Sequence, residues 1–225
     1  MTDYYKEKLS AEILKRVYEI APQRVREYFE AEVNHVLQYI RPSSLVLELG
    51  CGYGRILPSL ARKAKSVIGI DTSFASLFYG QEMLKDLSNC FLIQMNAIQL
   101  AFHDSIFDIV VCIQNGISAF HVNQIDLIRE SIRVTKHSGT ILFSSYSEKF
   151  WNHRLEWFQL QSNSGLLGEL DFERTRNGKI VCKDGFTATT VSSDQFKELA
   201  SEINNIEVKT VEIDESSIFC EIFKK

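Results

Sequence analysis

A glycine-rich stretch between residues 48 and 54 is the part of this sequence best suited to hold a ligand. It reads Glu-Leu-Gly-Cys-Gly-Tyr-Gly and overlaps the short apolar run Leu45–Leu49, which is typical of a strand buried on both faces. Glycines at alternate positions allow a sharp turn with no Cβ in the way, so a ligand can lie against bare backbone. The carboxyl edge of an open α/β sheet, where such a turn falls, is where these folds bind ligands.

An acidic residue, Asp71, ends the next apolar run and can accept hydrogen bonds from both hydroxyls of a ribose. A dinucleotide enzyme has a similar arrangement, but its fingerprint is GxGxxG, whereas the glycines here are spaced GxGxG and Arg55 follows them. Glu48 would repel a pyrophosphate and attract an ammonium or sulfonium group. The pattern therefore favours a nucleoside with a cationic tail over a dinucleotide. A glycine turn of purely structural use is the less favoured alternative.

The elements that position these residues alternate regularly between strand and helix. Strands are predicted at residues 45–49, 66–70, 90–95, 107–113 and 140–145, with helices at 55–63, at about 72–87 and at 123–134. Two further helices are predicted before them, at 4–20 and 23–40. Such alternation implies parallel pairing with right-handed crossovers, and hence an open doubly wound α/β sheet.

The pattern changes after residue 150. Residues 169–176 and 179–183 are predicted to form a small β-hairpin about Asn177-Gly178, whose residues suit the positive φ angles of its turn. A helix is predicted at about 194–203, and two alternating segments, 206–213 and 217–223, are predicted to pair antiparallel at the end of the chain. The expected fold is a mostly parallel seven-stranded sheet with an antiparallel C-terminal strand and a hairpin insertion.

Composition narrows the function classes. With a net charge of −4 the chain has no overall positive field to attract a nucleic acid. No apolar run is long enough to span a membrane, and the first residues do not resemble a signal peptide. The five cysteines form no CxxC motif, which favours free thiols in the reducing cytoplasm, and no histidine or cysteine spacing indicates a metal site.

Taken in order, these motifs resemble those of class I, Rossmann-like S-adenosylmethionine-dependent methyltransferases, particularly the small-molecule subgroup. The similarity runs from about residue 44 to 146 and is carried by residues 48–54, 69–73, 102–110 and 133–140. It implies one domain in four parts. These are N-terminal helices or a lid at 1–43, a cofactor-binding core at 44–146, an acceptor-side insertion at 147–192, and a closing helix and strand pair at 193–225.

The resemblance also implies roles for individual residues. Those expected to bind S-adenosylmethionine are Glu48 near the ammonium, Gly50, Gly52 and Gly54 along the methionine part, Asp71 at the ribose, Asn96 and Ala97 at the adenine, and Gln114 beside the methionine part. The family often has Asp where this chain has Asn96, but an amide oxygen can still accept from the adenine amino group. A second departure, His137-Ser138 in place of Pro-Gly, is expected to alter a turn rather than the site.

Methyl transfer is an in-line displacement that yields S-adenosylhomocysteine, and it needs a base only if the nucleophile must lose a proton. His121 is a candidate base, although a surface or helix-capping histidine is the favoured interpretation. Candidates for the wall of an acceptor pocket, or for stacking on a cation, are Tyr146, Trp151, Trp157 and Phe158. They could equally pack the hairpin on the sheet, and packing is the favoured interpretation for Trp157. Tyr4 and Tyr5 belong either to a lid over the cofactor or to a frayed terminus. The methylated atom cannot be read from the sequence.

Three functions remain open. The favoured one is methyl transfer to a small molecule, with no nucleic-acid or membrane partner. An Asn-Pro-Pro-Tyr or Asp-Pro-Pro-Tyr motif, which marks nucleic-acid enzymes of the family, is absent, and residues 114–117 read Gln-Asn-Gly-Ile instead. The alternatives are a non-catalytic S-adenosylmethionine-binding module and, less favoured because of Glu48, a nicotinamide-dependent oxidoreductase. No motif indicates an oligomeric state.

Overall fold

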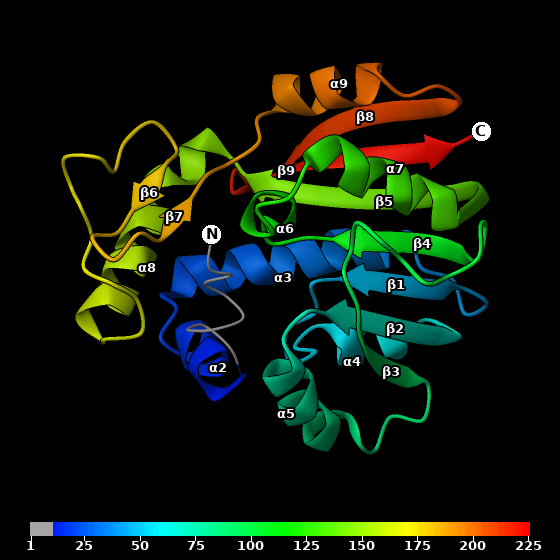
Figure 1. Ribbon diagram of the computed structural model, residues 1–225, viewed down its shortest axis with the longest axis horizontal. Helices are drawn as coiled ribbons and strands as arrows, with labels where there is room; N and C mark the ends of the chain where they lie inside the picture. Colours follow the sequence, from blue (N-terminus) through cyan, green and yellow to red (C-terminus); the bar gives the residue numbers. More distant parts are fainter. Residues whose placement is uncertain (1–10) are drawn as a thin grey trace.

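A seven-stranded sheet forms the centre of the protein in the computed structural model, which describes residues 11–225 (Figure 1). Its strand order is β3-β2-β1-β4-β5-β9-β8. The strands are β1 (Leu45–Leu49), β2 (Ser66–Asp71), β3 (Cys90–Gln94), β4 (Phe107–Cys112), β5 (Thr135–Tyr146), β8 (Ile206–Ile213) and β9 (Ser217–Lys224). The first five are parallel, and β9 runs antiparallel to both β5 and β8. The predicted fold class is therefore confirmed.

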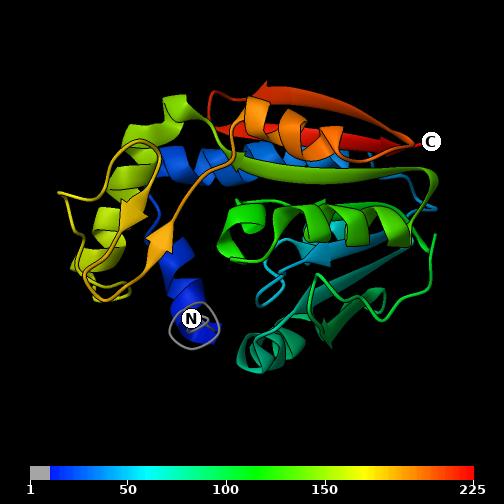
Figure 2. The same cartoon turned by 45° about the horizontal axis from the view of Figure 1, so that its top comes forward.

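Helices cover both faces of this sheet (Figure 2). On one face lie α3 (Gln23–Leu37), α4 (Leu57–Ala61) and α5 (Phe74–Leu84), and on the other lie α7 (Gln124–Val134) and α9 (Ser193–Ser201). The neighbours Val46 and Leu47 of β1 are both fully buried, each in the core of a different face. This explains why β1 is apolar at nearly every position. None of the helices between residues 11 and 225 is long and apolar enough to cross a membrane.

Side-chain caps fix where several helices begin. The Ser73 hydroxyl accepts a hydrogen bond from the Ser76 amide at the start of α5. At α9, Ser192 and Gln195 form a capping box, each side chain accepting from the other residue's amide. These caps satisfy amides that have no partner within the helix.

A third group of elements packs beside the carboxyl ends of the parallel strands. It consists of α2 (Ala11–Glu19), the short helix η1 (Glu148–Phe150), α8 (Trp151–Asn163) and a separate two-stranded sheet of β6 (Ile180–Val181) and β7 (Thr187–Ala188). Figure 1 shows this group on the side toward which β1, β2 and β4 point. Its apolar side chains form a core of their own, in which the Trp157 indole Nε1 donates to the Val17 carbonyl at 3.1 Å.

The predicted hairpin turn is present, and the two arms pair antiparallel, but only at isolated bridges, Leu170 with Cys182 and Arg176 with Lys179. Asn177 and Gly178 both have positive φ, and Arg176 and Lys179 exchange backbone hydrogen bonds across them. Residues 169–176 form no strand, however, because the Asp171 side chain accepts from the Arg174 amide and turns the chain. The strands that pair are β6 and β7, on the other side of a second turn.

Gly80→Ala is expected to destabilise the fold by about 1–3 kcal/mol, the usual cost of overpacking. A Cβ at Gly80 of α5 would lie 2.5 Å from the Tyr53 carbonyl oxygen and 3.0 Å from Leu92 Cδ1. Because the Tyr53 carbonyl belongs to the glycine-rich loop, it cannot move without displacing that loop. Urea unfolding measures the effect, with Gln81→Ala at an exposed position of the same helix as control. A Gly80→Ala protein as stable as the wild type would contradict this packing.

Candidate functional site

A cavity of about 300 Å³ lies at the carboxyl edge of the sheet, between the strand ends and the group containing α2 and α8. The predicted residues among those lining it are Glu48, Gly50, Gly52, Asp71, Asn96, Ala97, Gln114 and Tyr146. Their positions after β1, β2, β3 and β4 bring them to one edge, because parallel strands all end on the same side of a sheet. Gly54, His121 and Trp151 are not among the lining residues.

The glycine-rich loop presents Gly52 to the cavity and keeps Gly54 behind it. Both have positive φ, +55° and +80°, which favours glycine. A Cβ at Gly52 would lie 2.9 Å from Leu14 Cδ2, so α2 packs directly on this loop. A Cβ at Gly54 would instead lie 2.8 Å from Leu84 Cδ1 in the core. In this structure Gly54 therefore serves packing rather than lining the expected methionine subsite.

Asp71 connects the glycine-rich loop to the start of α5. Its Oδ2 accepts from the Gly52 amide and its Oδ1 from the Ser73 amide, both at 2.8 Å. A carboxylate offers about four acceptor positions, so both oxygens can still accept from a ligand hydroxyl. The same side chain thus orders the loop and faces the cavity at the expected ribose position.

Glu48 and Arg55 place opposite charges beside this loop. Glu48 is 7% exposed, and burial raises its pKa to about 8, with Arg55 opposing the rise and Asp71 adding to it. Within residues 11–225, Glu48 Oε2 and Arg55 Nη2 are buried without a hydrogen-bond partner. The Arg55 guanidinium lies 4.3 Å from the centre of the Tyr18 ring. Such a pair is complementary to the ammonium and carboxylate of an amino-acid tail, so these residues fit the methionine part of S-adenosylmethionine.

A strained turn after β4 carries Gln114. Gln114 and Asn115 follow one another with φ of 56° and 65°, a left-handed conformation that is uncommon for residues other than glycine. The backbone amide of Gln114 donates to Glu32 Oε2 at 2.8 Å and to Ser144 Oγ at 2.9 Å. Glu32 is fully buried, and burial raises its pKa to about 7 although Ser217 donates a hydrogen bond to it. Sequence reasoning did not identify Glu32.

The second residue of the turn is held from two further segments. Asn115 Nδ2 donates to the Thr189 carbonyl at 2.9 Å, and its Oδ1 accepts from Ser145 Oγ at 2.7 Å. The turn leads into the short helix α6 (Gly116–Ala119). It presents the Gln114 side chain to the cavity, where Oε1 accepts from the Tyr18 hydroxyl at 3.2 Å. Gln114 Nε2 is buried and has no partner in the described part of the chain.

Asn96 and Ala97 lie at the cavity wall after β3, at the expected adenine position. Asn96 is exposed and Ala97 is buried. Asn96 Oδ1 already accepts from the Ile98 amide at 3.2 Å. A carbonyl oxygen has a second lone pair, so it can still accept from an amino group of a ligand.

The far end of the cavity is aromatic. The rings that line it are those of Tyr18, Phe29, Tyr146, Trp157, Phe158 and Phe186. Trp157 packs, as expected, in the third core, which is the one formed by α2, α8 and their neighbours, and it also lines the cavity. One polar side chain, Gln161 of α8, is buried among these rings and was not identified from the sequence.

His121 and Trp151 do not reach the cavity. His121 is exposed and has a φ of 52°, and its neighbours Phe120 and Val122 line the cavity in its place. Trp151 is half-buried and packs against the third core from the outside. From the same helix, the residues that line the cavity are Trp157, Phe158 and Gln161, all three of them buried.

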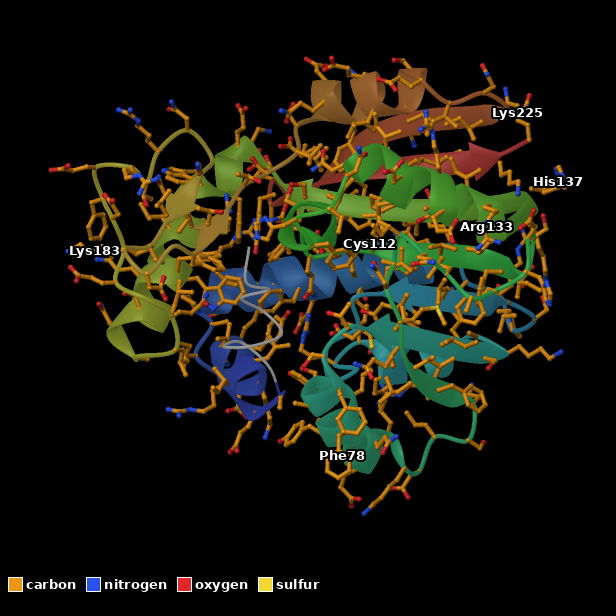
Figure 3. All side chains as sticks on the ribbon, in the orientation of Figure 1. Phe78, Cys112, Arg133, His137, Lys183 and Lys225 are labelled. Atoms are coloured by element: carbon orange, nitrogen blue, oxygen red, sulfur yellow. The ribbon has the colours of Figure 1, made fainter. Side chains whose placement is uncertain are left out.

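Two expectations remain, one for His137 and one for Tyr4 and Tyr5. His137 lies in the irregular first part of β5, where the pairing with β4 shifts register, and its Nδ1 lies 2.9 Å from the Lys225 carbonyl oxygen. Figure 3 places His137 and Lys225 at the opposite end of the molecule from Lys183 in the insertion, so this departure alters a strand irregularity far from the cavity. Tyr4 and Tyr5 are outside the described residues.

Comparison with known proteins agrees with this geometry. Residues 46–139 match the methyltransferase domain family. Over 104 residues the chain is 29% identical to YqeM of Bacillus subtilis, whose name proposes that it is a methyltransferase, and the match covers 45% of this chain and 42% of that protein. The chain thus spans under half the length of this curated relative.

Two solved structures share the fold over nearly their whole length, each with bound S-adenosylhomocysteine. Magnesium protoporphyrin IX methyltransferase ChlM from Synechocystis PCC 6803 has a TM-score of 0.67 and 16% identity, covering 99% of this chain and 97% of that one. The N-methyltransferase NodS from Bradyrhizobium japonicum WM9 has a TM-score of 0.60 and 15% identity, covering 94% and 96%. The present chain therefore has the class I, Rossmann-like fold of these methyltransferases, and its residues 46–139 resemble the methyltransferase domain family, as the sequence motifs predicted.

Proposed function

We propose that this protein is a cytoplasmic methyltransferase that uses S-adenosylmethionine to methylate a small molecule. The observation that carries the proposal is the buried Glu48 carboxylate with an unpartnered oxygen, beside Arg55 and a glycine-rich loop tied to Asp71. When bound, the cofactor supplies an activated methyl group on a sulfonium, which is already a good leaving group. The protein's part is to orient the nucleophile at about 3–3.5 Å in line with the breaking bond.

The predicted cofactor contacts that line the cavity, which exclude Gly54, each have a role in the proposed mechanism. Glu48 and Arg55 hold the two charges of the methionine tail, and Asp71 holds the ribose hydroxyls. Asn96 and Ala97 border the adenine. Gln114, fixed by its strained turn, lies next to the methionine part and orients it relative to the aromatic end of the cavity.

A small acceptor is supported by the shape of the site. The cavity is closed on one side by α2 and on the other by residues 147–192, which contribute Phe158, Gln161 and Phe186 to its wall. We infer that this segment is the acceptor-side insertion. The whole cavity measures about 300 Å³ and also has to hold the cofactor, so the space beside the aromatic rings suits a small molecule. All five cysteines are free, which agrees with a reducing compartment.

S-adenosylmethionine and S-adenosylhomocysteine are expected to bind, and NADH is not, because Glu48 would repel a pyrophosphate. Calorimetry with the three ligands tests this. Labelled-methyl transfer is then measured with a cell extract divided by a small-cutoff filter, and label is expected in the low-mass fraction.

Each other outcome of these measurements excludes a part of the proposal. Tight NADH binding without a response to the adenosyl ligands would indicate an oxidoreductase. Label found only in a protease- or nuclease-sensitive fraction would exclude a small acceptor. Binding with no transfer to either fraction would indicate a non-catalytic module.

A further inference from the structure

We propose that the acceptor is a flat aromatic molecule bearing a carbonyl or carboxylate oxygen, and that Gln161 recognises this oxygen. The inference rests on the proposed function, because it assigns the cofactor to the end of the cavity that contains the glycine-rich loop. It concerns the other end, where aromatic rings and one buried amide line the cavity and the Arg154 guanidinium packs against two of the rings.

The rings form a continuous wall. Ring centres are 5.3 Å apart for Phe29 and Trp157, 5.8 Å for Trp157 and Phe158, and 6.0 Å for Phe158 and Phe186. These residues come from α3, α8 and the loop before β7, so the wall does not depend on one element. Aromatic side chains favour aromatic ligands through stacked and edge-to-face contacts, and they offer little to a strongly polar aliphatic one.

Gln161 supplies the polar contact in this wall. The residue is 2% exposed, it lines the cavity, and its Nε2 has no hydrogen-bond partner among residues 11–225. A buried donor costs free energy when it is unpaired, so such a site selects ligands that bring an acceptor atom to it. A carbonyl or carboxylate oxygen on the ring provides that atom.

The charges near the wall favour an oxygen over an ammonium group. The Arg154 guanidinium lies 4.6 Å from the ring centre of Tyr146 and 5.5 Å from that of Phe158. Arg154 is 1% exposed and donates to the carbonyl oxygen of Gly178 at 2.6 Å. This cation occupies ring faces that a ligand ammonium would otherwise use and repels a further positive charge.

Carboxylates are confined to the other end of the cavity. Of the described residues that line it, the carboxylates are Glu48 and Asp71, and both belong to the cofactor subsite. An acceptor amine therefore meets no counter-ion beside the aromatic wall. The same lining contains no histidine in the described chain, so an acceptor hydroxyl or thiol must lose its proton without an imidazole beside it.

Four single-ring probes test the inference in protein saturated with S-adenosylhomocysteine: acetophenone, benzoate, ethylbenzene and benzylammonium. Ligand-observed NMR titration gives their affinities without requiring turnover. Acetophenone is expected to bind about three- to tenfold more tightly than ethylbenzene, the effect of one hydrogen bond. Benzoate is expected to bind more tightly than benzylammonium. The reverse order in either pair, or no binding of any probe, would overturn the inference.

Gln161→Leu is expected to abolish the difference between acetophenone and ethylbenzene, while Gln159→Leu, at an exposed position of the same helix, keeps it. A Gln161→Leu protein that still distinguishes the two probes would show that another group recognises the oxygen. Calorimetry with S-adenosylhomocysteine tests the cofactor assignment separately from the proposed role of Gln161. If it binds wild type and Gln161→Leu equally, the cofactor assignment stands whatever the probes do. If it fails to bind wild type, the proposed function itself is wrong.

Discussion

Glu48→Gln is expected to lower the affinity for S-adenosylmethionine by about ten- to a hundredfold. The substitution keeps the shape of the side chain and removes the charge that would meet the ligand ammonium, and a hydrogen bond to a charged group contributes about 1.5–3 kcal/mol. Calorimetry measures the loss, with Glu202→Gln at an exposed position as control. Adenosine, which lacks the amino-acid tail, is expected to bind both proteins equally. A Glu48→Gln protein with wild-type affinity would place the ammonium elsewhere.

The same variant is expected to change the pH dependence of binding. Because the pKa of Glu48 is raised to about 8, the carboxyl must release a proton before it can bind the ammonium at lower pH. Wild-type affinity should therefore fall as the pH drops below 8, by up to about tenfold per unit, and Glu48→Gln should lack this fall. A raised carboxyl pKa also means that this group favours the folded state when protonated. Its contribution is fully present below its ordinary pKa and is lost as the pH rises through 8.

Asp71→Ala is expected to weaken the binding of both S-adenosylmethionine and adenosine by at least about tenfold, because two hydrogen bonds to the ribose are lost. The substitution also frees the Gly52 and Ser73 amides that Asp71 holds at 2.8 Å, so the loop loses order in addition to the direct contact. Calorimetry with both ligands checks this. Asp126→Ala on the exposed side of α7 is the control.

The two ligands distinguish the two carboxylates. Glu48→Gln should affect only the ligand that has the amino-acid tail, whereas Asp71→Ala should affect both. An Asp71→Ala protein with unchanged dissociation constants would show that the ribose is held by another group. Circular dichroism should be that of the wild type, because Asp71 is only half-buried and lies outside the cores.

The central sheet could be predicted because its strands are buried on both faces. Val46 and Leu47 face different cores, so β1 is apolar at nearly every position and is recognisable without any alternation. Helix α8 was not predicted, although it is as long as its neighbours. Its buried side includes Arg154 and Gln161, two residues that ordinarily mark an exposed face, and its apolar period is correspondingly weak.

The residues of the candidate site also fall into two groups, those that could be predicted from the sequence and those that could not. Glu48 and Asp71 could be predicted because Glu48 immediately precedes the alternate glycines and Asp71 ends the next predicted strand. A carboxylate at the end of a buried strand can bind only a few kinds of ligand group. Tyr18, Glu32 and Gln161 lie on helices whose docking brings them to the cavity or its turn, and only tertiary packing determines that position. Glu32 in particular looks like a solvated helix residue, yet it is fully buried.

The strained turn after β4 also determines how much of the chain must be present for the site to form. Residues 46–139 match the methyltransferase domain family and contain Gln114, but both acceptors of its amide, Glu32 and Ser144, lie outside that range. So do the partners of Asn115. An excised fragment, or a chimaera that grafts this range onto foreign flanks, would leave a left-handed pair of residues with buried polar groups unsatisfied. Exchange of parts between relatives should succeed only when α3, β5 and the segment after β7 are exchanged together with the turn.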